Sequence, residues 1–357
     1  MLGKWWQRPD AIVAGLTPLA HGRGKECYCF GRCLLVMECE DHSFSRRFKD
    51  LFAECAIELT GNETLPRVDF RLSCLASDPG LLTVSMAPSP LDGASFIRRL
   101  LPERGYLECS NSAHGWRMLA LPEAPEEPVL AFGASDILVS RNHPWQRAIA
   151  MHAISTAFRM QPDVFVFHAA SIGLLEKGVL LCGPKGAGKT TLSLCFASRG
   201  HAFLGDEWAV VSALTGELLP LRRSASIRPG PRPSAIEDYL SNHSCNAEVL
   251  ADGTERVHAR VGAIFPRASA KVVPLTHIFF LRRFAPRPSV ERFVRNGGEL
   301  PPVSPLLASV WGHSVGQRAI DLFRTLDKAR WWHLDVGGSP EETAKLVEET
   351  VKEDPWG

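Results

Sequence analysis

The chain has 357 residues, 45% of them apolar, and a formal net charge of +1. A typical domain has about 150 residues, so the length predicts two domains, and the apolar fraction is sufficient for packed cores. A nearly neutral chain has no global bias toward polyanions or bilayers, so we expect neither nucleic acid nor membrane as a partner.

Cysteine usage and the N-terminal sequence both favour a cytoplasmic protein. Ten cysteines in a chain of this length are too sparse for a secreted disulfide scaffold. The first residues contain no long apolar signal segment, and no stretch approaches the roughly 18 consecutive apolar residues of a membrane-spanning helix. We therefore expect reduced thiols and no membrane span.

Residues 1–140 are predicted to form a strand-rich α+β domain, whose role the sequence does not indicate. Short apolar runs between turn formers predict strands over residues 27–39, 68–76 and 81–87. The segment 122–128 is rich in proline and glutamate and predicts a loop.

From residue 141 to residue 357 the pattern changes to alternating helices and strands. Helical spacing after Pro144 predicts a helix to about Met160. Strands are then predicted over residues 164–172, 178–182 and 201–211, and a helix over 191–199 is expected to stop at Gly200. This order is typical of an α/β P-loop core.

Three further segments complete the predicted C-terminal domain. Five positions of residues 220–233 are Pro or Gly, which predicts an irregular loop at the active site. Residues 275–283 predict a buried strand with basic residues at its end. The capping box from Ser339 to Glu342 predicts a terminal helix to about Lys352.

A glycine-rich motif, G-x-x-x-x-G-K-[ST], follows the predicted strand 178–182. Its glycines allow a tight coil in which backbone N–H groups converge on one anion, and the next helix points its positive end at the same place. Lys189 is expected to bind the β- and γ-phosphates of ATP, and the Thr190 hydroxyl to bind Mg²⁺. The predicted nucleotide-binding residues are Gly183, Pro184, Lys185, Gly186, Ala187, Gly188, Lys189, Thr190 and Thr191.

An acidic pair, Asp206 and Glu207, follows the apolar stretch AFLG. In P-loop proteins an acid at the end of a neighbouring strand holds Mg²⁺ directly or through water. A second carboxylate beside it is suited to accept a proton from a hydroxyl nucleophile. The alternative interpretation is a surface strand with two solvated acids.

The stretch from His168 to Val211 resembles the catalytic core of the HPr kinase/phosphorylase family, which belongs with the phosphoenolpyruvate carboxykinase-like P-loop folds. The shared order is a histidine after a strand, the glycine-rich loop, a helix ending in Arg-Gly-His at 199–201, and an acidic pair. Glu207 stands where the family usually has Asp. The resemblance implies a P-loop kinase domain that uses ATP and Mg²⁺.

The resemblance also implies roles for individual residues. Asp206 and Glu207 share metal binding and activation of the acceptor hydroxyl, with Thr190 as a further metal ligand, and neither acid is assigned alone as base or as ligand. His168 is expected near the phosphates, and a histidine packed between strands is the alternative.

Segment 222–233 lacks the Gly-rich signature loop of the family's bifunctional members, so a reversible reaction is not implied. Arg228 in this segment is suited to neutralise the transferring phosphoryl group or to bind an acidic acceptor, and Arg222 and Arg223 are weaker candidates. A solvated basic loop is the alternative.

The sequence thus predicts an ATP-dependent kinase for a Ser or Thr hydroxyl of a protein or peptide, with natural-product precursor peptides as one class of acceptor. Two alternatives stay open: a nucleotide-gated regulatory module with slow ATP hydrolysis, and a kinase for a small-molecule hydroxyl. A homo-oligomer is compatible with the sequence.

Overall fold

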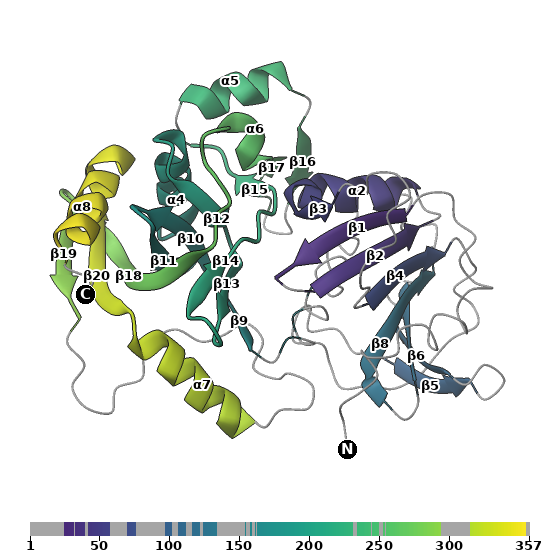
Figure 1. Cartoon of the computed structure of the whole chain (residues 1–357). Helices are drawn as coiled ribbons and strands as arrows, with labels where there is room; N and C mark the ends of the chain where they lie inside the picture. Colours follow the sequence, from purple (N-terminus) through teal and green to yellow (C-terminus); the bar gives the residue numbers. More distant parts are fainter. Residues whose placement is uncertain are drawn as a thin grey trace. The chain divides into compact units, whose positions relative to one another are not determined.

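The computed structural model describes two compact units, Met1–Pro162 with Val310–Gly312, and Asp163–Ser309 with His313–Gly357 (Figure 1). In the first unit it describes residues 25–57 (except 32, 40 and 41), 70–75, 97–101, 106–111, 116–121, 124–133, 154, 158 and 161. In the second it describes residues 163–293 (except 231–233, 244, 250–252 and 254) and 315–354. The predicted boundary between residues 140 and 141 stays a prediction.

The first unit is built on a mostly antiparallel sheet. Within the described residues, eight strands join in the order β3-β1-β2-β4-β8-β7-β6-β5. Helix α2 (His42–Phe52) and the short 3₁₀ helix η3 (Ala53–Cys55) precede β3 in the chain. The strands are β1 (Lys25–Phe30), β2 (Cys33–Cys39), β3 (Ala56–Ile57), β4 (Phe70–Leu75), β5 (Ile97–Leu101), β6 (Tyr106–Asn111), β7 (Trp116–Leu121) and β8 (Ala124–Gly133).

The strand-rich character predicted for this unit is confirmed in the described residues. The run 27–39 is a hairpin of β1 and β2 that turns at Gly31, and the run 68–76 contains β4. The predicted strand over 81–87 lies outside the described residues. So does the predicted helix over 144–160, except for Ile154 and Phe158, which are helical and buried.

The loop predicted over residues 122–128 is wrong from Ala124 onward, where β8 begins. Pro125 and Pro128 are tolerated because β8 pairs with β4 only from Leu130 onward, so no pairing with β4 needs their missing N–H groups. The register with β7 also shifts beside this segment. The proline content predicted a loop, but Pro128 lies opposite Ala120 of β7 and is compatible with a strand because it has no partner in β4.

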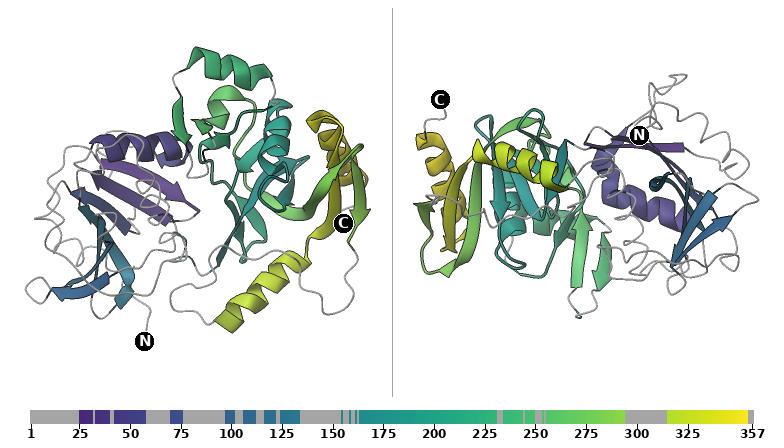
Figure 2. Two further views of the ribbon diagram at one scale, coloured as in Figure 1. Left: turned by 180° about the vertical axis from the view of Figure 1, so that it is seen from behind. Right: turned by 90° about the horizontal axis from the view of Figure 1, so that it is seen from below.

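The second unit contains a mixed sheet covered by helices on both faces (Figures 1 and 2). Among the described residues, the main path runs β12-β10-β11-β18-β14-β13-β9, and β20 pairs with both β18 and β19. The strands are β9 (Val164–Phe167), β10 (Ala169–Leu174), β11 (Lys177–Cys182), β12 (Ala202–Gly205), β13 (Ala209–Ser212), β14 (Glu217–Leu219), β18 (Val273–Ala285), β19 (Ser289–Arg292) and β20 (Arg330–Gly337).

Successive side chains of the central strands point to opposite faces of the sheet and belong to two separate hydrophobic cores. Val179 and Leu181 of β11 pack with α4 (Lys189–Ser198) and α8 (Pro340–Glu353) on one face. Leu180 and Cys182 pack on the other face, where Leu326 of α7 (Val315–Asp327) joins the cluster. This alternation is the period-two pattern of a strand buried on both sides.

Two segments that were each predicted as one strand are broken at matching points. The run 164–172 divides at His168 into β9 and β10, and the run 201–211 divides at residues 206–208 into β12 and β13. β10 pairs with β12, and β9 pairs with β13. The two segments therefore pair with each other on both sides of their breaks, and the breaks lie at the same place in the sheet. Apolar periodicity continues across such a break and therefore cannot reveal it.

A small three-stranded sheet carries the segment that was predicted to be irregular. β15 (Ala225–Ile227) pairs with β17 (Glu255–Ala259), which pairs with β16 (Asn246–Val249). Helices α5 (Ser234–Asn242) and α6 (Val261–Ile264) contribute to the core beside it. The prediction is wrong for residues 225–227, because the Pro and Gly positions flank them and leave them free to pair. The described residues 228–230 are irregular, as predicted.

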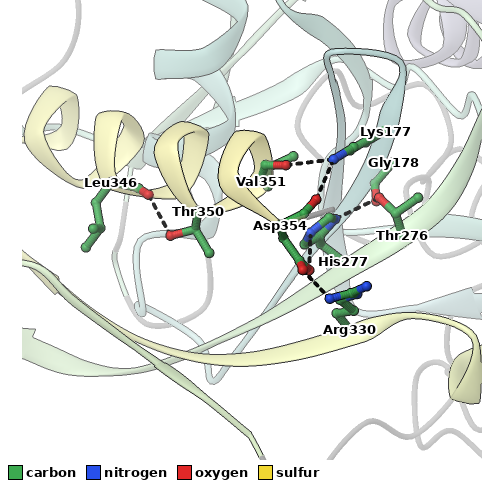
Figure 3. A network of polar contacts seen from close by, with 9 residues as sticks. All are labelled: Lys177, Gly178, Thr276, His277, Arg330, Leu346, Thr350, Val351 and Asp354. Atoms are coloured by element: carbon green, nitrogen blue, oxygen red, sulfur yellow. Dashed lines mark hydrogen bonds and ion pairs between the residues drawn. The ribbon is translucent and has the colours of Figure 1, made fainter. Parts of the chain in front are cut away.

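The predicted terminal helix is confirmed as α8, and polar contacts fix both of its ends. Ser339 and Glu342 form the capping box at its start. At its end, Lys177 Nζ donates to the carbonyl oxygens of Val351 and Asp354, each at 2.9 Å (Figure 3). The Asp354 carboxylate contacts buried His277 at 3.3 Å and also binds Arg330. No helix in the described part of the chain is long and apolar enough to cross a membrane.

Candidate active site

The glycine-rich loop connects β11 to α4, as the sequence predicted, and its glycines are required by geometry. Gly183, Gly186 and Gly188 have φ values of 153°, 89° and 95°, which side chains disfavour. A Cβ atom at Gly183 would also lie only 2.8 Å from the Leu281 carbonyl oxygen of β18. The loop therefore combines a left-handed coil with close approach to the next strand.

Lys189 and Thr190 begin α4 and turn toward the loop and toward β12 respectively. Lys189 Nζ donates to the carbonyl oxygens of Gly183 and Pro184, at 2.7 and 3.0 Å. Burial lowers the pKa of Lys189, and the charge of Asp206 opposes that shift. Thr190 Oγ1 lies 3.0 and 2.9 Å from the two carboxylate oxygens of Asp206 and donates toward them.

The acidic pair is divided between two environments. Asp206 is 3% exposed, and its pKa is raised to about 6, first by burial and then by the charge of Glu207. Glu207 binds Arg223, and Arg256 Nη1 lies 3.8 Å from its second oxygen. The backbone of Glu207 is left-handed, with φ of 61°, so the two successive side chains diverge.

His168 joins the same site from the break between β9 and β10. Its Nδ1 lies 3.2 Å from the Glu207 carbonyl oxygen, and its side chain is exposed. Partial burial and the charge of Lys189 lower the pKa of this imidazole. The contact joins the break in one segment to the break in the other.

These groups surround a cavity of about 310 Å³. Among the described residues, its lining includes many that the sequence singled out: His168, Lys185, Gly186, Gly188, Lys189, Thr190, Thr191, Asp206, Glu207 and Arg228. Ser226, Ile227, Pro229 and Gly230 also line it, and they belong to segment 220–233, which was predicted to lie at the active site. Leu194 and Ile236 line it as well, and the sequence did not indicate them.

Several predicted site residues do not line this cavity. Gly183, Pro184 and Ala187 belong to the glycine-rich loop but do not line the cavity, and the Ala187 N–H donates to the Pro184 carbonyl oxygen within the loop. Arg222 is buried and donates to the Ala268 carbonyl oxygen at 2.9 Å, so it supports the fold beside the site.

Arg223 binds Glu207 and does not line the cavity. The sequence did not indicate Arg256 of β17, which lies 3.8 Å from Glu207. An arginine within a strand has no sequence feature that reveals which distant carboxylate it will contact.

The residues around the cavity are suited to two kinds of ligand, an anion and a cation. The loop N–H groups, the α4 N-terminus and Lys189 suit a polyphosphate anion. The Thr190 hydroxyl and the Asp206 carboxylate are hard oxygen donors that lie within hydrogen-bond distance of each other, which fits a small divalent cation such as Mg²⁺.

Comparison with known proteins adds little to this description. No model of a known protein family matches the chain, and no curated protein matches it. One similar solved structure is the HPr(Ser) kinase/phosphatase from Coxiella burnetii, at 14% sequence identity and a TM-score of 0.27. The match covers 52% of this chain and 93% of that protein. A likeness of this size carries no argument about activity, so the function has to be argued from the site itself.

Proposed function

We propose that the second unit is an ATP-dependent kinase that transfers the γ-phosphoryl group to a Ser or Thr hydroxyl of a protein or peptide. One observation carries the proposal: the Thr190 hydroxyl reaches both oxygens of buried Asp206 at the mouth of a glycine-built anion site. A P-loop hydroxyl and an acid from a neighbouring strand are the two groups that phosphoryl transfer requires at this position.

Thr190 and Asp206 would hold Mg²⁺, which when bound neutralises negative charge on the phosphates. Lys189, held over the loop by two carbonyl oxygens, provides a positive charge for the β- and γ-phosphate oxygens. The loop N–H groups orient the same phosphates.

The two acids share metal binding and activation of the acceptor in this proposal. Asp206 would hold Mg²⁺ together with Thr190, and a carboxylate oxygen of the pair that does not contact the metal would take the proton from the acceptor hydroxyl. The hydroxyl oxygen then bonds to the γ-phosphorus while the bond to the β–γ bridging oxygen breaks and ADP leaves. Glu207 is neutralised by Arg223 and Arg256, and it positions the turn that presents Asp206 and His168.

The cavity size and rim favour an acceptor that is presented by a chain segment. At about 310 Å³ the cavity lies at the small end of ligand pockets, which range from about 300 to 1,000 Å³. Phosphates and one hydroxyl side chain would fill it. Exposed Arg228 and the adjoining Pro229 and Gly230 form part of the rim, where an acidic acceptor segment would meet positive charge.

The test measures transfer of label from γ-labelled ATP to a Ser/Thr peptide library, with ATP affinity determined in parallel by calorimetry. Asp206→Asn should lower transfer by at least about 100-fold, since a positioned base contributes that much or more. It should still bind ATP, because the loop and Lys189 are unchanged, but more weakly with Mg²⁺, because Asn is a poorer ligand than Asp for that cation. Glu349→Gln, the same change from carboxylate to amide at an exposed position of α8, is the matched control.

Two results would contradict the proposal. One is a wild-type protein that binds no ATP with Mg²⁺. The other is an Asp206→Asn variant that transfers label at the wild-type rate. ATP binding with slow hydrolysis and no labelled acceptor would instead favour a nucleotide-gated regulatory module.

A further inference from the structure

The end of β18 is exposed, unlike the middle of the strand. Residues 275–281 are all buried, but Arg282, Arg283 and Phe284 are exposed in succession. The register with β20 shifts between Leu281 and Phe284, which marks a bulge. Bulges commonly re-aim a side chain beside a functional site.

A buried carboxylate of β20 fixes this bulge. Asp335, whose side chain is 4% exposed, accepts from Arg282 Nε at 3.0 Å and from Arg283 Nε at 3.2 Å. Binding both neighbouring arginines to one acid holds the backbone in the bulged form. Phe284, the next residue, is thereby presented to solvent with 68% of its surface exposed.

Phe284 lies against the glycine-rich loop. A Cβ atom at Gly188 would lie 3.9 Å from Phe284 Cζ and 3.9 Å from Val336 Cγ1, which is ordinary van der Waals contact. Gly188 also lines the cavity and immediately precedes α4. An apolar surface made of an exposed ring and a valine therefore adjoins the phosphate site.

We propose that Phe284, backed by Val336, is the stacking surface for the base of the bound nucleotide. This inference rests on the proposed function, because it needs the phosphates in the loop. A nucleotide held there extends its ribose and base beyond the loop, and a purine covering Phe284 would remove an exposed aromatic face from water. Single exposed apolar residues are common, but this one is held by a fixed bulge and lies on the side of the loop toward which a side chain at Gly188 would point.

The chemistry of stacking also sets the expected selectivity. Every base has a flat π face, so an aromatic ring contributes affinity with little discrimination between bases. Phe284 should therefore strengthen the binding of ATP and GTP to similar extents. It should contribute nothing to a ligand that has phosphates and no base.

The experiment compares calorimetric affinities of the full chain for ATP and for inorganic tripolyphosphate, both with Mg²⁺. Alanine substitution of a ring that stacks on a base weakens binding by roughly 5- to 150-fold. Phe284→Ala should lose ATP affinity in that range and leave tripolyphosphate affinity unchanged. Phe323→Ala, a matched change at a 37% exposed phenylalanine of α7, should alter neither.

Phe284→Trp provides the second measurement, because it should retain ATP affinity and report binding by quenched fluorescence of the new ring. Equal loss of ATP and tripolyphosphate in Phe284→Ala would mean a disturbed loop and would overturn the stacking role. Unchanged ATP affinity in that variant would overturn it too. A wild-type protein that binds neither ligand would refute the proposed kinase site itself.

Discussion

Burial of His277 predicts a specific loss of stability in mild acid. This histidine is completely buried in β18, its Nδ1 contacts the Thr276 hydroxyl at 2.8 Å, and its Nε2 faces Asp354 (Figure 3). Burial lowers its pKa from 6.5 to about 4, although the charge of Asp354 opposes the shift. The folded protein therefore keeps a neutral imidazole at pH values where the unfolded chain binds a proton.

The sign and size follow from proton linkage. A lowered folded-state pKa gives stability that is complete above pH 6.5 and is lost as pH falls toward 4. Between about pH 7.5 and about pH 5 the free energy of unfolding should fall by about 2 kcal/mol on account of this residue. Asp206, whose pKa is raised to about 6, acts in the opposite direction over the same range.

The effect is isolated by comparing the wild type with His277→Gln in urea titrations followed by tryptophan fluorescence. Asp206 contributes equally to both proteins, so the stability advantage of the wild type should shrink by about 2 kcal/mol between about pH 7.5 and about pH 5. His243→Gln, at an exposed histidine, should show no such change. An advantage of the same size at both pH values would refute the argument from burial.

Two further predictions concern the loop and α8. Ser339→Ala should lower the free energy of unfolding by about 1 kcal/mol through loss of the N-cap, while Ser198→Ala within α4 should be nearly neutral; equal effects in urea titrations would contradict this. Gly183→Ala should abolish calorimetric ATP binding, because its Cβ would meet the Leu281 carbonyl oxygen at 2.8 Å. Gly216→Ala, which has positive φ but open space, should retain it.

Local signals in the sequence located the elements around the candidate site. The glycine-rich motif, the apolar run before it and the helix after it correspond to the loop between β11 and α4. The capping box likewise marked the start of α8. These features depend mainly on residues a few positions apart, so a short segment of the sequence contains the residues that define each of them.

The arrangement of the site depended on contacts that are distant in sequence. The breaks at His168 and Glu207 arise because each segment pairs with the other on both sides of the turn. Arg256 reaches Glu207 from β17, and the bulge at Phe284 is held by Asp335 of β20. None of these pairings leaves a periodic signal in the chain.

The sequence by itself therefore located the glycine-rich loop and the helix after it, because glycine conformations and helix starts are properties of short segments. Only the tertiary structure decided that Asp206 faces Thr190 while Glu207 faces two arginines. The physical reason is that strand pairing brings charges together across the sheet, and burial then gives two adjacent acids different partners and different basicity.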